Sequence, residues 1–188
     1  MTREQLAHLL RSAAQIADES DVVVIRSQSI LGTYAEDALP AQAVASLEAD
    51  LAFFDDDDNA KSDSVDAHIG EESRFHATFG YYGQGVSIST AILPAGWRDR
   101  IVVLENDLTA PGRGLCLDRH DLVVSKLVAG REKDFGFAWA LIEAGLVDAE
   151  VLVERAQRLE TVPAVQRRVR RWIDSCVKQL AARRDSDR

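Results

Sequence analysis

The sequence lacks any long apolar stretch. No run of hydrophobic residues approaches the roughly 20 that a membrane-spanning helix needs, which excludes an ordinary transmembrane protein. The N-terminal segment, MTREQLAHLLRSAAQIADES, carries charges throughout and has no uncharged core of the kind found in secretion signals. These two absences predict a cytoplasmic protein.

Cysteine is also scarce. The two cysteines, Cys116 and Cys176, lie far apart in the sequence, and neither belongs to a CxxC pair. The spacing therefore offers no basis for a zinc site. We interpret both residues as reduced thiols in or near the core.

The chain as a whole lacks an excess of positive charge. Its formal net charge is −9, which argues against a protein that coats nucleic acid nonspecifically. The charge is uneven, however, because residues 167–188 hold eight Lys/Arg against three Asp, a net of +5, and the first 166 residues therefore carry −14. This basic segment is predicted to be an amphipathic helix docked on the core. The alternative is that it contacts an RNA backbone through Arg167, Arg168, Arg170 and Arg171.

The remaining composition is that of an ordinary globular protein, with 46% hydrophobic and 28% charged residues. A chain of this length can form one well-cored domain. Helical spacing of apolar residues predicts a first helix at 3–19, capped by Thr2. Further patterns predict short helical turns at 27–34 and 41–44, strands at 22–25, 46–54 and 100–106, and a hairpin within 75–93. Residues 55–73 are predicted to be a solvated loop, with a helical turn near 63–69 as the alternative. Helices are predicted at 119–130, 131–145, 148–159 and 163–183. This order of elements is an α+β pattern.

The strand at 22–25, VVVI, ends abruptly in Arg-Ser-Gln-Ser. A continuous β-branched run is typical of a strand buried on both faces, and ligands are commonly held at strand ends in α/β proteins. Ser27 and Ser29 fall at the start of the short helix that follows, where free backbone N–H groups favour anions. Two interpretations stay open: a hydroxyl that binds a phosphate oxygen, or Ser27 as a simple helix cap.

Two carboxylates mark the strand at 46–54. Glu48 and Asp50 are two residues apart, so their side chains leave the same face of the strand. Two acids on one face repel each other unless a cation lies between them. Two-metal phosphoryl transfer uses paired carboxylates of this kind to hold Mg²⁺. The alternative is an exposed sheet face with two solvated acids.

Taken in order, these stretches resemble a known family. A strand, a serine-bearing helix start and a second strand with a (D/E)xD pair are similar to the polymerase-β-like nucleotidyltransferases. More narrowly, the chain resembles small bacterial proteins related to the AbiEii-type toxins of type IV toxin–antitoxin systems. The segments that carry this resemblance are VVVIRSQSILG, SLEADL, GEESRFHATFGYYGQGV, LPAGW and HDLVVSKLVAGREKDFGF, within about residues 20 to 145. The most specific of them is SKLVAGREKDF.

The resemblance implies a fold and an activity. The fold is α+β, with a polymerase-β-like core (a mixed twisted sheet flanked by helices) at 1–110 and a helical region at 111–188 that packs on the core and completes the site. The activity is Mg²⁺-dependent transfer of a nucleoside monophosphate from an NTP to an acceptor hydroxyl. The implied partners are an RNA acceptor, tRNA in related toxins, and a cognate antitoxin protein.

The resemblance also implies roles for the strand-end residues. Ser27, together with Ser29, contacts the nucleoside triphosphate. Glu48 and Asp50 hold Mg²⁺.

Further roles fall in the segment SKLVAGREKDF. Lys126 neutralises phosphate charge. Arg131 and Lys133 lie nearby, where they either help to bind the nucleotide, the role we assign to Arg131, or are simply solvated. Asp134 is a further acid, either a metal ligand or the base for the acceptor hydroxyl. Gly130 allows a close backbone approach, and it shares one helix face with Lys126 and Asp134 if the helix is continuous.

Two departures from the family pattern leave rival hypotheses open. Arg26 stands where the family usually has glycine, and it either clamps phosphate in bidentate fashion or blocks the pocket. The third strand carboxylate has no clear position, and Glu105 and Asp134 are its candidates. One rival is therefore a catalytically silent protein of the same fold that serves as a binding or regulatory subunit. The other is an interaction protein with no nucleotide site.

Overall fold

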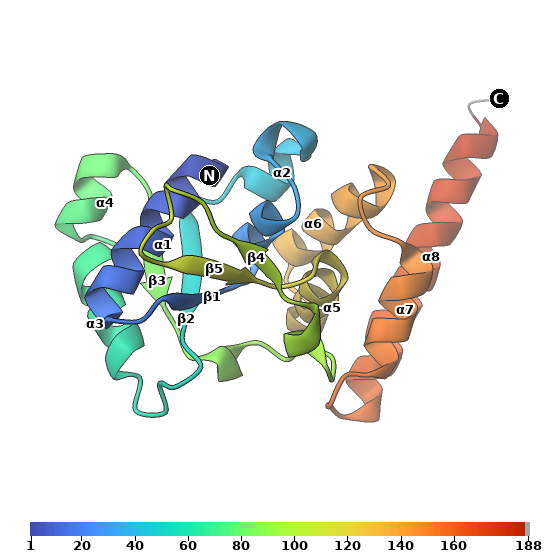
Figure 1. Ribbon diagram of the computed structural model, residues 1–188. Coiled ribbons are helices and arrows are strands. Elements are labelled where there is room, and N and C mark those ends of the chain that lie inside the picture. The colour runs from blue at the N-terminus through green and yellow to red at the C-terminus, as the bar shows by residue number, and fades with distance from the viewer. Residues whose placement is uncertain (187–188) are drawn as a thin grey trace.

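The protein is built on one five-stranded sheet, seen in the computed structural model of Figure 1, which describes residues 1–186 and side chains up to residue 183. The strands are β1 Asp21–Ile25, β2 Glu48–Ala52, β3 Tyr82–Gly85, β4 Val102–Leu104 and β5 Arg113–Cys116. Their order across the sheet is β3-β2-β1-β5-β4. Because β1 pairs antiparallel with β2 and parallel with β5, the sheet is mixed.

Helices precede, interrupt and follow the strands. The first begins as predicted: Thr2 Oγ1 accepts a hydrogen bond from Gln5 N at 3.2 Å, and Gln5 Oε1 accepts one from Thr2 N at 2.8 Å, which is a capping box. The α-helices are α1 Arg3–Ala17, α2 Ala41–Val44, α3 Ala60–Ile69, α4 Arg74–Phe79, α5 Arg119–Ala129, α6 Glu132–Glu143, α7 Ala149–Gln157 and α8 Pro163–Ser186. The 3-10 helices are η1 Ser27–Gly32, η2 Glu36–Ala38, η3 Ile88–Thr90 and η4 Trp97–Arg100.

The central strand β1 lies at the heart of the core. Its last four residues, from Val22 to Ile25, are fully buried, as a run of β-branched residues predicts. Helix α1 contacts β1, β2, β3 and β5 and packs against α3, whereas η1 contacts β1, β2, β4 and β5 and also α5. The element η1 therefore links the end of the central strand to the helical region.

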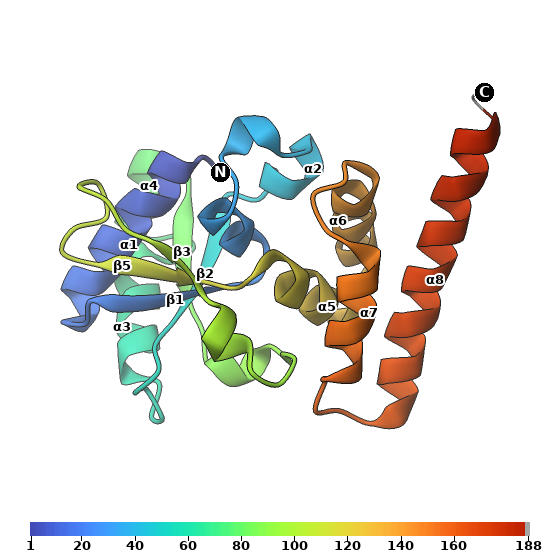
Figure 2. The same cartoon turned by 45° about the vertical axis from the view of Figure 1, so that its right-hand side comes forward.

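Helices α5 to α8 form the second half of the molecule. Figure 2 shows α5 beside the sheet, α7 next to it and α8 outermost, extending past α7 toward the C-terminus. Val169, Ile173 and Cys176 are buried on the inner face of α8, so the prediction of a docked amphipathic helix is confirmed. None of the helices in the described part of the chain is both long and apolar enough for a membrane span.

A buried ionic cluster ties the helical region to the segment before β4. Asp121 in α5 is fully buried. Its Oδ2 forms an ion pair with Arg100 Nε at 2.8 Å, and its Oδ1 forms one with Arg155 Nε at 3.3 Å. Burial raises the pKa of Asp121, although the two guanidinium groups oppose the rise. The cluster thus joins η4, α5 and α7 through one carboxylate.

The structure corrects two predictions about the sheet. The hairpin expected within 75–93 is absent. Residues 74–79 are helical, and β3 pairs in parallel with β2 instead of with a second strand from the same segment. Strand β5 was not predicted, and it lies inside the sheet, between β1 and β4. Its sequence, RGLC, has no alternation to reveal it. Gly114 lets α1 pack closely over this strand, because a Cβ atom would lie 2.7 Å from Leu10 Cδ1 of α1 and would displace that side chain.

The other predicted elements hold more closely. The α+β class with a mixed sheet and flanking helices is confirmed, as are the four late helices. The loop predicted at 55–73 instead contains the ten-residue helix α3. The boundary expected at residue 110 precedes β5, so the sheet takes its fifth strand from 113–116 and the helical region starts with α5.

We expect Asp121→Ala to lower the free energy of unfolding by about 3 kcal/mol, because two guanidinium groups lose their buried counter-charge. Urea denaturation measures the change. Glu154→Ala is the control, since Glu154 pairs with Arg158 at a surface where both side chains are 51% exposed, and that loss costs about 0.5 kcal/mol or less. Equal losses in the two variants would contradict the structural role of Asp121.

Candidate active site

A cleft of about 450 Å³ opens where β1 and β2 meet the junction of α5 and α6. This volume lies within the range of small-molecule sites. Two carboxylates and four cationic side chains line it, with polar and apolar neighbours. The lining residues are Arg26, Ser27, Gln42, Ala45, Ser46, Glu48, Asp50, Lys126, Arg131, Lys133 and Phe137. The structure therefore brings most of the predicted site residues into one cleft, although they are up to about a hundred residues apart in sequence.

The register of the sheet places the carboxylates. Ile25, the last residue of β1, pairs with Asp50 of β2, so the chain leaves β1 directly beside the Asp50 carboxylate. Glu48 lies two residues earlier on β2, on the same face, and is partly exposed. The prediction that Glu48 and Asp50 share one face is confirmed by their place in the same cleft.

Arg26 adopts a backbone conformation that normally belongs to glycine. Its φ is 62° and its ψ is −152°, a region that residues with a Cβ atom rarely occupy. A residue held there costs about 1–3 kcal/mol of strain. The resemblance places glycine at this position, and the structure gives the physical reason for that preference.

The side chain of Arg26 reaches the buried carboxylate. Arg26 Nη1 lies 2.9 Å from Asp50 Oδ1, and Asp50 is only 6% exposed. Burial raises the pKa of Asp50 to about 6, even though the charge of Arg26 lowers it; the nearby Glu48 adds to the rise. The protein thus keeps a cation beside a carboxylate that is costly to ionise without one.

A second cluster holds the other cations in place. Asp134, fully buried, accepts hydrogen bonds from Lys126 Nζ at 3.1 Å and from Arg131 Nε at 2.8 Å. Burial opposes its ionisation, but the donors from Arg131 and the charge of Lys126 outweigh it and lower the pKa of Asp134. Lys126 also lies over the ring of Phe137, with its Nζ 4.5 Å from the centroid. Burial lowers the pKa of Lys126, and Asp134 counteracts this.

The cluster forms because the helix is interrupted, not because it is continuous. Helix α5 ends at Ala129, and Gly130 closes it at φ 68°, a left-handed position that suits glycine. Arg131 then caps the N-terminus of α6, whose Asp134 accepts a hydrogen bond from Arg131 N at 3.3 Å. Gly130 therefore serves as a helix terminator, and Lys126, Gly130 and Asp134 do not share the face of one continuous helix.

Two predicted site residues lie elsewhere. Ser29 is fully buried and its Oγ donates to Leu117 O at 3.2 Å, so its hydroxyl holds two segments together and does not line the cleft. Glu105 follows β4 at the opposite end of the sheet from Arg26, where its charge acts on Arg113 beside Asp21. Glu105 is therefore not a third carboxylate of the cleft.

The residues present fit a divalent cation. Carboxylate oxygens are the ligands that Mg²⁺ prefers, and Asp50 Oδ1 is buried without an aligned hydrogen-bond donor. Among the residues that the structure describes, no group of three or more His, Cys, Asp or Glu is placed to hold a metal. A cation between Glu48 and Asp50 would therefore complete its shell with water and with phosphate oxygens, as Mg²⁺ commonly does.

Comparison with known families agrees with this geometry. The model of one family, described as a nucleotidyltransferase of unknown function (DUF6036), matches residues 4–181. The chain belongs to this nucleotidyltransferase family. No curated protein and no solved structure matches it. The family match covers α1 through most of α8, so both the sheet and the helical region belong to it.

Several residues that line the cleft of this nucleotidyltransferase-family chain were not predicted from the sequence. Gln42, Ser46 and Phe137 line the cleft, but each is a common residue type without a motif of its own. Phe137 could have been found from its spacing, since it lies one helical turn after Asp134 and faces the same way. Gln42 lies in α2 and Ser46 in the short connection from α2 to β2, and only the fold brings these residues to the cleft.

A pair of variants at Arg26 isolates the backbone strain. Arg26→Gly and Arg26→Ala both remove the guanidinium, but only glycine adopts φ 62° without strain. We expect the glycine variant to have the higher free energy of unfolding, by about 1 kcal/mol. Urea denaturation measures both. Arg167, an exposed position inside α8, provides the control. There the alanine variant should be the more stable one, by about 1 kcal/mol. If the glycine variant were the more stable at both positions, or the alanine variant at both, strain at Arg26 would be excluded.

The raised pKa of Asp50 predicts a pH-dependent stability. Between the ordinary value of 3.8 and about 6, the folded protein binds a proton that the unfolded chain has lost, so stability falls as pH rises through this window. Asp50→Asn should therefore raise the free energy of unfolding at pH 7 by about 2–3 kcal/mol and change it little at pH 4. Urea denaturation at the two pH values tests this, with the exposed Asp57→Asn as control. Equal effects at both pH values would refute it.

Proposed function

We propose that the protein is an Mg²⁺-dependent nucleotidyltransferase, which moves a nucleoside monophosphate from an NTP to an acceptor hydroxyl and releases pyrophosphate. The observation that carries this proposal is the convergence of Ser27, the pair Glu48 and Asp50, and the cations Lys126 and Arg131 on one cleft. Membership of a nucleotidyltransferase family supports it. Hydroxyl, carboxylates and cations are the groups that a metal–triphosphate complex requires.

In this proposal Glu48 and Asp50 hold Mg²⁺. The bound ion supplies neutralisation of the charge on the reacting phosphates. Arg26 pairs with Asp50 in the structure, and it would be free to bind the phosphates if Asp50 held the ion, because a guanidinium binds phosphate in bidentate fashion. Arg26 thus exchanges one anion for another, and Asp50 is never left buried without a cation.

Lys126 and Arg131 bind the phosphates from the helical side. Arg131 has a half-exposed side chain (51%), and it extends into the cleft toward Glu48 and Asp50, whose charges act on it. Asp134 is a positioning residue: it is fully buried and accepts hydrogen bonds from both cations. These contacts favour this role over the metal ligand or base that the resemblance implies.

The transfer step requires no groups other than these side chains and the proposed ion. The acceptor oxygen attacks the α-phosphorus, the bond from that phosphorus to the bridging oxygen breaks, and pyrophosphate leaves against Lys126 and Arg131. The proton of the acceptor hydroxyl passes to Glu48, which is more exposed than Asp50 and so can be reached by an incoming acceptor.

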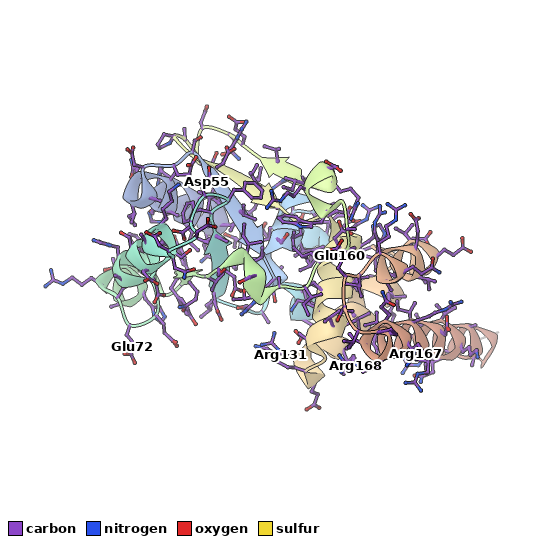
Figure 3. All side chains as sticks on the ribbon, turned by 90° about the horizontal axis from the view of Figure 1, so that it is seen from below. Asp55, Glu72, Arg131, Glu160, Arg167 and Arg168 are labelled. Carbon is purple, nitrogen blue, oxygen red and sulfur yellow. The ribbon has the colours of Figure 1, made fainter. Side chains whose placement is uncertain are left out.

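An RNA, such as tRNA, is the acceptor that we propose. The arginines of α8 begin beside the cleft, because Arg168 Nη2 donates to Val128 O at 2.6 Å and lies 3.3 Å from where a Cβ of Gly130 would be. Figure 3 shows Arg131, Arg168 and Arg167 in a row along one edge. A basic row of this kind suits a phosphate backbone. Arg188 lies outside the described residues, and the side chain of Arg184 is also not described.

The biological setting that we propose is the toxin half of a toxin–antitoxin or phage-defence pair, acting in the cytoplasm with a cognate antitoxin protein. This part rests on the resemblance of SKLVAGREKDF to AbiEii-type toxins. The structure adds that Lys126 and Asp134, both from this segment, form the ion pair beside the cleft.

The decisive experiment is incubation with each labelled NTP, Mg²⁺ and total RNA. We expect labelled RNA with the wild type and a rate at least about 100-fold lower with Asp50→Asn, because the metal loses a ligand. Leu108→Ser, an exposed position outside the cleft, should retain full activity. Failure of the wild type to transfer with any NTP, together with no NTP binding by calorimetry, would refute the proposal.

A catalytically silent protein of the same fold is the second candidate. The observation that favours it is the contact of Arg26 with Asp50, since the carboxylate already has a cation from the protein itself. This candidate predicts that Asp50→Asn leaves the cellular phenotype unchanged, whereas the enzyme predicts that the phenotype is lost. Comparing growth with each variant separates the two.

A further inference from the structure

A second pocket adjoins the cleft and shares a wall with it. This pocket, of about 330 Å³, lies between residues 90–92 and helix α5. Arg26, Lys126 and Arg131 line both the pocket and the cleft, so these three cations stand between the two spaces. Carboxylates line only the cleft.

The two walls of the second pocket are mostly apolar. Helix α5 contributes Leu122, Ser125, Lys126, Val128 and Ala129. All of these except Val128 share one helix face, at spacings of three, four and seven residues. The opposite wall is Thr90, Ala91 and Ile92. Ile92 is 42% exposed although it is a large aliphatic residue. Because Ile92 lines the pocket and is partly exposed, its side chain is accessible to a ligand bound there.

We propose that this pocket binds the nucleobase of the nucleoside triphosphate, an inference that rests on the proposed function. The triphosphate needs the cations and a metal, which the cleft side of the wall provides. The base is joined to the α-phosphate through the ribose, so it must lie within one ribose of the cations that bind the phosphates. The pocket beyond Arg26 and Lys126 meets this requirement.

The chemistry of the lining suits a base. A nucleobase has two flat faces that bury well against aliphatic side chains and polar edges that need hydrogen bonds. Val128, Ala129 and Ile92 offer apolar contacts, and Thr90 and Ser125 bring one hydroxyl to each wall. The rim is formed by Arg26 and Arg131, where the ribose and α-phosphate would pass. The larger cleft is then left for the acceptor and the departing pyrophosphate.

Comparing each NTP with inorganic tripolyphosphate tests the assignment, since both carry three phosphates and only the NTP has a base. Calorimetry of the full chain with Mg²⁺ gives the ratio of the two affinities. We expect the best NTP to bind more tightly than tripolyphosphate. We expect Ile92→Ser to reduce this preference roughly tenfold, because an aliphatic contact is lost, while tripolyphosphate affinity stays unchanged.

Two further variants make the test sharper. Ala129→Phe, at an exposed helix end, fills the pocket and should abolish the preference for NTP with tripolyphosphate binding retained. Leu108→Ser is the matched control, because Leu108 is 50% exposed, like Ile92 an exposed aliphatic in a loop, and lines neither space. It should change neither affinity.

The outcomes distinguish this inference from the function on which it rests. If tripolyphosphate binds and the preference for NTP is absent in the wild type or unaffected by Ile92→Ser and Ala129→Phe, the base pocket is wrong and the phosphate site stands. If the wild type binds neither ligand and transfers no nucleotide, the proposed function is wrong and the base pocket fails with it.

Discussion

The structure around the cleft depends on one ionic contact, that of Arg26 with Asp50. Asp50 pairs with the last residue of the central strand, so its carboxylate is buried where the sheet ends. An ionised group in that place needs a cation close by. The cation is the guanidinium of Arg26, the residue directly after β1, whose Nη1 lies 2.9 Å from Asp50 Oδ1. Arg26 makes this contact in a backbone conformation that normally belongs to glycine. Strain of this kind persists where the surroundings fix it, and such places are commonly functional.

The other cations are arranged by a carboxylate that never meets solvent. Asp134 holds Lys126 through one oxygen and Arg131 chiefly through the other. The left-handed turn at Gly130 makes this possible, because it ends one helix and lets the next begin with Arg131 as its cap. A continuous helix would place Lys126 and Asp134 about 12 Å apart along its axis, beyond hydrogen-bond reach. The turn therefore converts a sequence spacing of eight residues into a direct ion pair.

Much of this arrangement could be predicted from sequence, where local pattern decides. The alternation around Glu48 and Asp50 places both on one strand face, and apolar spacing locates the late helices. The prediction fails where tertiary contacts decide. RGLC forms the inner strand β5 because β1 and β4 both pair with it and α1 packs over Gly114. The segment after α4 becomes one parallel strand because β2 needs a partner, and neither choice leaves a local signal.

The same distinction explains the candidate site. Residue type and spacing singled out Ser27 and the pair Glu48 and Asp50, and only the resemblance to polymerase-β-like nucleotidyltransferases added Lys126 to them; the fold brings all four to one cleft. Burial, which sequence does not reveal, keeps two other predicted site residues out of the cleft lining. The hydroxyl of Ser29 donates to a carbonyl in the core, and the carboxylate of Asp134 accepts hydrogen bonds from two cations.

Arg26 links these observations. It stands between the carboxylates on one side and the apolar pocket on the other, and it lines both. A glycine there would leave the two spaces joined and Asp50 without its nearest cation. In the proposed enzyme, a metal ion would compete with the guanidinium of Arg26 for Asp50, and a ligand that brings its own phosphates would ease that competition by offering the guanidinium another anion. Under that proposal, arginine in place of glycine would couple metal binding to phosphate binding instead of simply removing the site.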